Sequence, residues 1–115
     1  MNYTPLTNYR TVTINQTYGQ NATILSFPKQ AMVTFVGTIG DATVVDREFS
    51  RVGMFITGGQ ALYKWEVMAD VGSAHEINAG LCFVGAGQSI IANGNNGGQV
   101  SISTMTGTFH IFEIN

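Results

Sequence analysis

The sequence has 115 residues, enough for one domain, and 44% of them are hydrophobic, enough for a buried core. Only 10% are charged, against about 25% in a typical soluble domain, and the net charge is −2. The five basic residues are scattered, which disfavours a nucleic-acid-binding protein, and the single cysteine, Cys82, rules out a disulfide within the chain.

The first nine residues are polar, contain one proline and lack an apolar run. They predict a flexible N-terminal arm over residues 1–9, followed by a single β-sandwich domain over residues 10–115. Because neither a signal peptide nor an apolar stretch of membrane-spanning length is recognisable, we expect a protein that is made in a host cytoplasm and does not enter a membrane.

From residue 10 onward, short apolar stretches alternate with turn signals about every 8–12 residues. Strands are expected at 10–15, 22–27, 31–36, 42–45, 52–57, 61–69, 81–84, 89–92, 99–103 and 108–114, with a short edge strand at 74–78. Turns are expected in the Gly- and Asn-rich segments between them, among them 37–41, 93–98 and 105–107. The pattern predicts an all-β fold of about nine or ten short strands, either an antiparallel β-sandwich or a small barrel.

The stretch 61–69 shows the clearest alternation, with apolar side chains at every second position. Such a period indicates a strand with one face in the core, and it is expected to form a hairpin with 52–57 across Gly58-Gly59-Gln60. Leu62 and Met68 fall on the other face, which is expected to be exposed. Two apolar side chains there favour contact between this face and another subunit. The predicted core anchors of this strand and of the last strand are Tyr63, Trp65, Val67, Phe109 and Ile111.

Two short motifs suggest cofactor or metal chemistry, and both are incomplete. Gly85-Ala86-Gly87-Gln88 begins like a dinucleotide-binding loop, but the third glycine position holds Ile90 and no helix is expected to follow. His75-Glu76 opens like a zinc-protease motif, yet Ala79 takes the place of the second histidine. We therefore expect a β-bend at the first motif, an ordinary strand at the second, and no cofactor.

Asp41, Asp46 and Glu48 lie in or beside the most charge-dense part of the chain. Their carboxylates have the chemistry to share a calcium ion, although the spacing is not that of an EF-hand loop. A solvated charged loop is the simpler interpretation. Both alternatives stay open at this point.

Three classes of function are compatible with such a chain. A charge-poor surface is poorly protected against association, which favours a permanent assembly in which the arm, through Tyr3, Leu6 and Tyr9, reaches a neighbouring subunit. A sugar-binding module is the alternative, with Tyr63 and Trp65 as an aromatic platform and 93–98 as a hydrogen-bonding loop. An enzyme would require His75 or His110 beside a nucleophile, since catalytic triads are recognised in space and not by spacing.

The C-terminal third, at Gly87-Gln88-Ser89-Ile90-Ile91 and again at 107–114, resembles the final strands of small all-β structural modules in bacteriophage virions. These include capsid decoration proteins, head fibres and tail tip domains, some of them similar to trimeric C1q/TNF-like jelly rolls. The resemblance implies a jelly-roll-like antiparallel β-sandwich. It also implies a non-enzymatic virion protein that forms a homo-oligomer, with a trimer favoured, and docks on other virion proteins without binding nucleic acid. No catalytic or binding residues carry over, and the chain is short for a ten-strand jelly roll.

Overall fold

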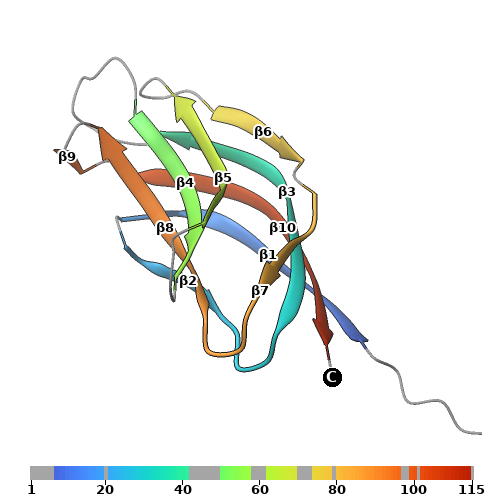
Figure 1. The fold of residues 1–115 in the computed structure, drawn as a ribbon. Helices are drawn as coiled ribbons and strands as arrows, with labels where there is room; N and C mark the ends of the chain where they lie inside the picture. Colours follow the sequence, from blue (N-terminus) through green and yellow to red (C-terminus); the bar gives the residue numbers. More distant parts are fainter. Residues whose placement is uncertain are drawn as a thin grey trace, which may run out of the picture.

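The computed structural model describes residues 7–19, 21–41, 50–57, 62–69, 74–78, 80–96, 99–100 and 102–114. At residues 7, 50–51, 62–69, 93–96 and 99–100 it describes the backbone alone. Every regular element in these ranges is a strand (Figure 1). The strands are β1 (Thr7–Tyr18), β2 (Thr23–Ser26), β3 (Ala31–Asp41), β4 (Ser50–Ile56), β5 (Leu62–Ala69), β6 (Ala74–Asn78), β7 (Cys82–Val84), β8 (Ser89–Asn96), β9 (Gln99–Val100) and β10 (Ser103–Ile114).

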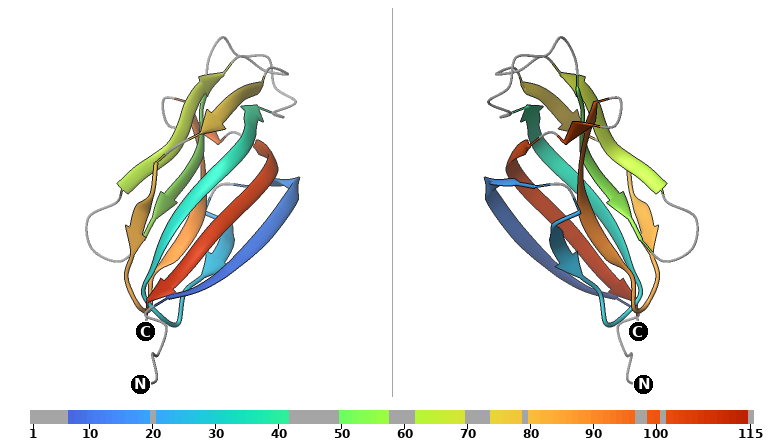
Figure 2. Two further views of the ribbon diagram at one scale, coloured as in Figure 1. Left: turned by 90° about the vertical axis from the view of Figure 1, so that its right-hand side faces the viewer. Right: turned by 90° about the vertical axis from the view of Figure 1, so that its left-hand side faces the viewer.

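The strands form two antiparallel sheets that lie against each other as two layers (Figure 2). In the first sheet the order is β1-β10-β3-β6, and β7 pairs with the same strand, β3, further along its length. In the second sheet the order is β2-β8-β4-β5, and β9 pairs with β8. The all-β, antiparallel and sandwich-like character expected from the sequence is therefore confirmed.

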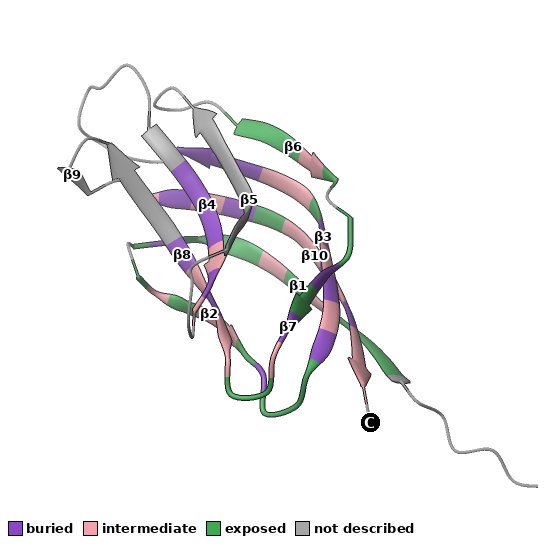
Figure 3. Ribbon diagram, viewed as in Figure 1, coloured by how far each residue is buried: buried purple, intermediate pink, exposed green. Residues whose placement is uncertain are grey.

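The core fills the space between the two sheets. Buried and less buried residues alternate along much of β3 and β10 (Figure 3), because successive side chains of a strand point to opposite faces. Phe109 and Ile111 of β10, for which the sequence predicts core positions, are both fully buried. The ring of Phe109 lies 4.9 Å from the ring of Phe35 on the neighbouring strand β3. The second sheet faces them with buried residues from β4 and β8, namely Val52, Met54, Ile56, Ile90 and Ala92.

Two segments expected as turns lie inside long strands. Residues 37–41 belong to β3, and residues 105–107 belong to β10. The prediction was wrong because Gly37 and Gly107 do not turn the chain: they face each other across the paired strands, where a side chain on either would meet the backbone of the other. A glycine in a strand can mark such a close approach as well as a bend.

The predicted boundary of the N-terminal arm also requires a correction. β1 begins at Thr7, so residues 7–9, which the sequence assigns to the arm, are paired with β10 as far as Ile114. The polar composition of these residues hides the strand, whereas the long C-terminal strand supplies a partner for their backbone. The other arm residues, 1–6, lie outside the described residues.

Other local differences follow from pairing partners that are distant in sequence. Residues 93–96, expected in a loop, extend β8, because β4 pairs with them as far as Asn95. The predicted buried strand at 81–84 is buried only at alternate positions: Cys82 and Val84 are buried, whereas Leu81 and Phe83 are exposed. The predicted strand at 42–45 lies outside the described residues.

The expected hairpin between 52–57 and 61–69 is confirmed as the antiparallel pair β4–β5. Its register shifts between Met54, opposite Trp65, and Phe55, opposite Tyr63. Strict alternation is therefore interrupted at Lys64. The side chains of residues 62–69 lie outside the described part of the chain, so the assignment of Tyr63, Trp65 and Val67 to the core stays a prediction.

Burial of Tyr18 at the end of β1 predicts a loss of stability at alkaline pH. Desolvation raises the pKa of the Tyr18 hydroxyl above its ordinary value of 10.0, and a hydrogen bond with Gln16 offsets part of this. As the pH rises, the Tyr18 hydroxyl therefore loses its proton in the unfolded chain before it does so in the folded protein. The contribution of the neutral Tyr18 to the free energy of unfolding is fully present below pH 10.0 and is lost as the pH rises toward the Tyr18 pKa of the folded protein. We expect Tyr18→Phe to lose less stability than the unaltered chain between about pH 9 and about pH 11, measured by urea unfolding. An equal loss in both proteins would contradict this, because the remaining tyrosines are common to both.

Candidate assembly surface

The outer face of the first sheet carries a row of four apolar side chains from four different strands. The register places Tyr9 of β1 opposite Phe112 of β10, Phe112 opposite Met32 of β3, and Met32 opposite Phe83 of β7. Directly opposed residues of antiparallel strands share a face of the sheet, so these four side chains form one continuous line. We call Tyr9, Phe112, Met32 and Phe83 the apolar row.

The two ends of the apolar row are its most exposed parts. Tyr9 is 57% exposed and Phe83 is 49% exposed, whereas Phe112 and Met32 between them are partly buried. Two more apolar side chains are exposed: Val36 of β3 and Leu81, which directly precedes β7. Isolated exposed apolar residues are common, but a contiguous apolar group on one face marks an interaction surface.

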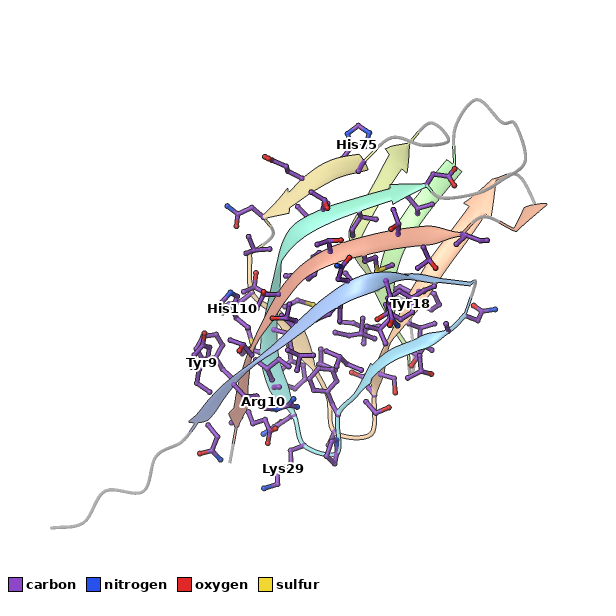
Figure 4. All side chains as sticks on the ribbon, turned by 180° about the vertical axis from the view of Figure 1, so that it is seen from behind. Tyr9, Arg10, Tyr18, Lys29, His75 and His110 are labelled. Carbon is purple, nitrogen blue, oxygen red and sulfur yellow. The ribbon has the colours of Figure 1, made fainter. Side chains whose placement is uncertain are left out.

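Tyr9 is held in place by its neighbours on β10. Its ring lies 4.9 Å from the ring of Phe112 and is stacked on His110 at 6.1 Å, with an angle of 5° between the last two ring planes. A hydrogen bond of 2.8 Å joins the Tyr9 hydroxyl to Nδ1 of His110. Figure 4, which views the molecule from behind, shows Tyr9 and His110 side by side. The exposed end of the row is therefore fixed by contacts within the chain itself.

Beyond the row, the outer face is covered by small neutral polar side chains. The hydroxyls of Thr13 and Thr108 lie 3.3 Å apart, and the Thr106 hydroxyl donates to Oδ1 of Asn15 at 3.0 Å. These cross-strand pairs satisfy the polar groups within the sheet itself. The face is thus wide and uncharged next to the apolar row.

Very little charge reaches this face. Among the described residues that the register places on it, Glu76 of β6 is the only acidic or basic one apart from His110. Arg10 Nε and Glu113 Oε1 form an ion pair 2.9 Å long. By the alternation of β1 and β10, these two residues belong to the other face of the sheet. An exposed ion pair of this kind contributes little stability. Covering the described part of this face would therefore desolvate one carboxylate, that of Glu76.

The residues predicted for the assembly interface do not all come together. Tyr9 lies at the end of the apolar row, but Tyr3 and Leu6 lie outside the described residues. Leu62 and Met68 belong to β5 of the second sheet, whereas Tyr9 belongs to β1 of the first. Their side chains are not described, so their part in an interface stays a prediction.

Sequence reasoning missed three members of the apolar row. Met32 lies in a strand that is apolar on both faces, a pattern that fits a covered outer face. Phe112 follows from the alternation in the last strand, since Phe109 and Ile111 point inward. Phe83 could not have been found, because the run at 81–84 carries no polar residue to reveal which side faces out.

The motifs considered for cofactor and metal binding have plain structural roles. Gly85-Ala86-Gly87-Gln88 forms a turn closed by a bond of 3.1 Å from the Gln88 N–H to the Gly85 carbonyl, with Gly87 at φ +83°, and a strand follows it. The expected β-bend is confirmed. Cys82 is buried in the core and acts there as a small apolar residue.

The candidate cation site is only partly described. Asp41 ends β3 opposite Ser103 and is 1% exposed, so it is not in the solvated loop that the sequence suggested. Asp46 and Glu48 lie outside the described residues. Within the described part of the chain, no group of three acidic, histidine or cysteine side chains is close enough to hold a metal ion.

The histidines considered for an enzyme lie apart from each other. His110 is on β10 and His75 is on β6, with β3 between these two strands, and Figure 4 shows them at different ends of the sheet. His110 contacts Tyr9.

In the portion of the chain that is described, no helix is long and apolar enough to cross a membrane. No protein-family model matches the chain, and neither does any curated protein or any solved structure.

Proposed function

We propose that this protein is a non-enzymatic structural subunit, a capsid or tail component of a bacteriophage virion, that acts by assembling with copies of itself and docking on other virion proteins. It needs no cofactor for this role. The observation that carries the proposal is the apolar row, which crosses four strands and is exposed at both ends, on a sheet face where the described residues include one carboxylate. Burying such a row against a partner is favourable, because apolar area leaves water at little cost in desolvated charge.

We include a jelly-roll arrangement of the two sheets in this proposal, and the strand order supports it. The first strand pairs with the last, and the chain passes from one sheet to the other between β1 and β2, between β2 and β3, and between β3 and β4. Interleaving of this kind is typical of Greek-key and jelly-roll sandwiches. Together with the resemblance at 87–91 and 107–114, it favours a virion module. A trimer is the oligomer that the resemblance implies.

The first test is the substitution Phe83→Asp, at the most exposed phenylalanine of the apolar row. The side chain is 49% exposed, so the fold should tolerate the change, whereas a carboxylate in the middle of a contact surface has to be desolvated. We expect the assembly held by the row to weaken about tenfold or more, as for a central interface residue. Sedimentation velocity over a concentration series measures this, and circular dichroism checks the fold.

Ala74→Asp is the matched control, because it places the same carboxylate at an exposed position of β6, away from the row. It should leave the association unchanged. A strictly monomeric unaltered chain at high concentration would contradict the proposal. If the Phe83→Asp and unaltered chains associated equally, the apolar row would not be the surface through which the protein assembles.

Sugar binding is the second candidate function, and it is favoured by the exposed aromatic ring of Tyr9 on a sheet face that also carries threonine and asparagine side chains. Residues 93–96, which the sequence places in a hydrogen-bonding loop, are part of a strand. The side chains of Tyr63 and Trp65 lie outside the described part of the chain, so their aromatic platform stays a prediction. A glycan that binds the unaltered monomer, and whose binding is lost in Tyr9→Ala, would favour this function over assembly.

A further inference from the structure

β1 forms one edge of the first sheet. Among the strands that the structure describes, it pairs with β10 alone, through twelve consecutive residue pairs without a register shift. A strand of twelve residues spans about 40 Å at the usual rise. This is a long edge with backbone groups available to another strand.

The direction of those backbone groups follows from one hydrogen bond. The Ile114 N–H donates to the Gln30 carbonyl at 3.0 Å, so Ile114 directs its backbone groups toward the β3 side of the sheet. Successive residues of a strand direct their N–H and C=O groups to opposite sides, so the odd-numbered residues of β10 bond to β1. Their partners, beginning with Asn8 opposite Glu113, are the even-numbered residues of β1.

The odd-numbered residues of β1 therefore present their N–H and C=O groups at the open edge. Among the described residues, no backbone hydrogen bond outside the strand ladders reaches them. Their side chains lie on the outer face of the sheet, next to the apolar row. These residues are Tyr9, Thr11, Thr13, Asn15 and Thr17.

The edge lacks the features that usually prevent pairing between sheets. β1 contains no proline, no lysine and no bulge. Its one charged residue, Arg10, is paired with Glu113 of the same chain. A second strand can therefore approach without meeting an unpaired charge.

The chemistry of the edge fits a copy of itself. Along the edge that faces β10, β1 already pairs threonine with threonine and asparagine with threonine, at Thr13–Thr108 and Asn15–Thr106. A second β1 offers the same residue types at the same spacing. Threonine pairs across antiparallel strands are favourable, and threonine suits strands in general.

We propose that two copies of this chain pair antiparallel through their β1 strands, edge to edge, joining their first sheets into one continuous sheet. The proposal rests on the assembly function proposed above and specifies one of its contacts. In the register that places odd-numbered residues opposite odd-numbered ones, the outer faces of both copies lie on the same side. The dimer thus carries two apolar rows on one surface, and both stay free for docking.

The Phe83→Asp chain isolates this contact, because association through its apolar row is weakened. We expect it to remain dimeric in sedimentation velocity. Amide exchange of the dimer, followed by NMR, should show the odd-numbered amides from 9 to 17 exchanging about tenfold or more slowly at high than at low protein concentration, because only the edge contact protects them. The even-numbered amides of β1 should be protected at both concentrations.

Two lysine substitutions then separate the edge from the face. Thr13→Lys and Thr108→Lys both remove the Thr13–Thr108 hydrogen bond and both place a lysine in the same row of the sheet, but only Thr13 lies at the edge. We expect Thr13→Lys to weaken the dimer about tenfold or more and Thr108→Lys to leave it intact, because an edge lysine opposes pairing. Equal effects of the two variants would overturn the proposal.

The remaining outcomes distinguish this contact from the assembly function. A monomeric Phe83→Asp chain, or odd-numbered amides that exchange equally fast at all concentrations, would overturn the edge pairing, while association of the unaltered chain would leave the proposed function standing. A monomeric unaltered chain would overturn both.

Discussion

Replacing Gly37 by alanine is expected to destabilise the domain by about 3 kcal/mol or more, because the added methyl group has no space between β3 and β10. A Cβ on Gly37 would lie 2.6 Å from the Cα of Gly107 and closer still to the Thr106 carbonyl oxygen. The partner glycine is equally confined, since a Cβ on Gly107 would lie 2.7 Å from the Phe35 ring and 2.8 Å from the Gly37 Cα. Backbone atoms cannot rotate away as side chains can, so the two central strands would have to separate.

Urea unfolding measures this loss, and Gly80→Ala is the matched control. A Cβ on Gly80 meets no atom within 4 Å, so the same substitution there should change the free energy of unfolding by about 0.5 kcal/mol or less. Since a domain of this size is stable by only about 5–15 kcal/mol, the Gly37→Ala chain should unfold at clearly lower urea. Equal stability of the Gly37→Ala and Gly80→Ala chains would show that the two strands can shift apart without cost.

Phe109→Ala is expected to destabilise the folded chain by about 3–5 kcal/mol, the range for a large aromatic residue removed from a core. Phe109 is fully buried near the middle of β10, and its ring lies 4.9 Å from that of Phe35 at an angle of 46°. Its removal takes apolar contacts from both sheets and leaves a cavity that the surrounding strands cannot close. The same urea measurement tests it.

Phe112→Ala provides the comparison, because it removes the same side chain three positions along the same strand. Phe112 is only partly buried on the outer face, so its loss should cost about 1–2 kcal/mol in the isolated chain. In an association assay we expect the opposite ranking of the two variants. Phe112→Ala weakens contact through the apolar row, whereas Phe109→Ala does not do so while the protein is folded. If both variants lost the same stability, the distinction between inner and outer faces of β10 would be wrong.

The sequence by itself determined the features that depend on local order. Alternation with a period of two identified the strands and the inward direction of Phe109 and Ile111, because successive side chains of a strand must point to opposite faces. The short glycine-rich connection identified the β4–β5 hairpin, since its two strands are neighbours in sequence. The low content of charge drew attention to association before any surface was known.

The tertiary structure alone decided which distant residues meet. Tyr9, Met32, Phe83 and Phe112 are far apart in the chain, and they form one row only because the registers of three strand pairs coincide. Gly37 and Gly107 likewise face each other only because of the register between β3 and β10. In the sequence, a glycine that turns the chain cannot be distinguished from one that lets a neighbouring backbone come close. Register between distant strands is set by the packing of the whole core, and no local pattern contains it.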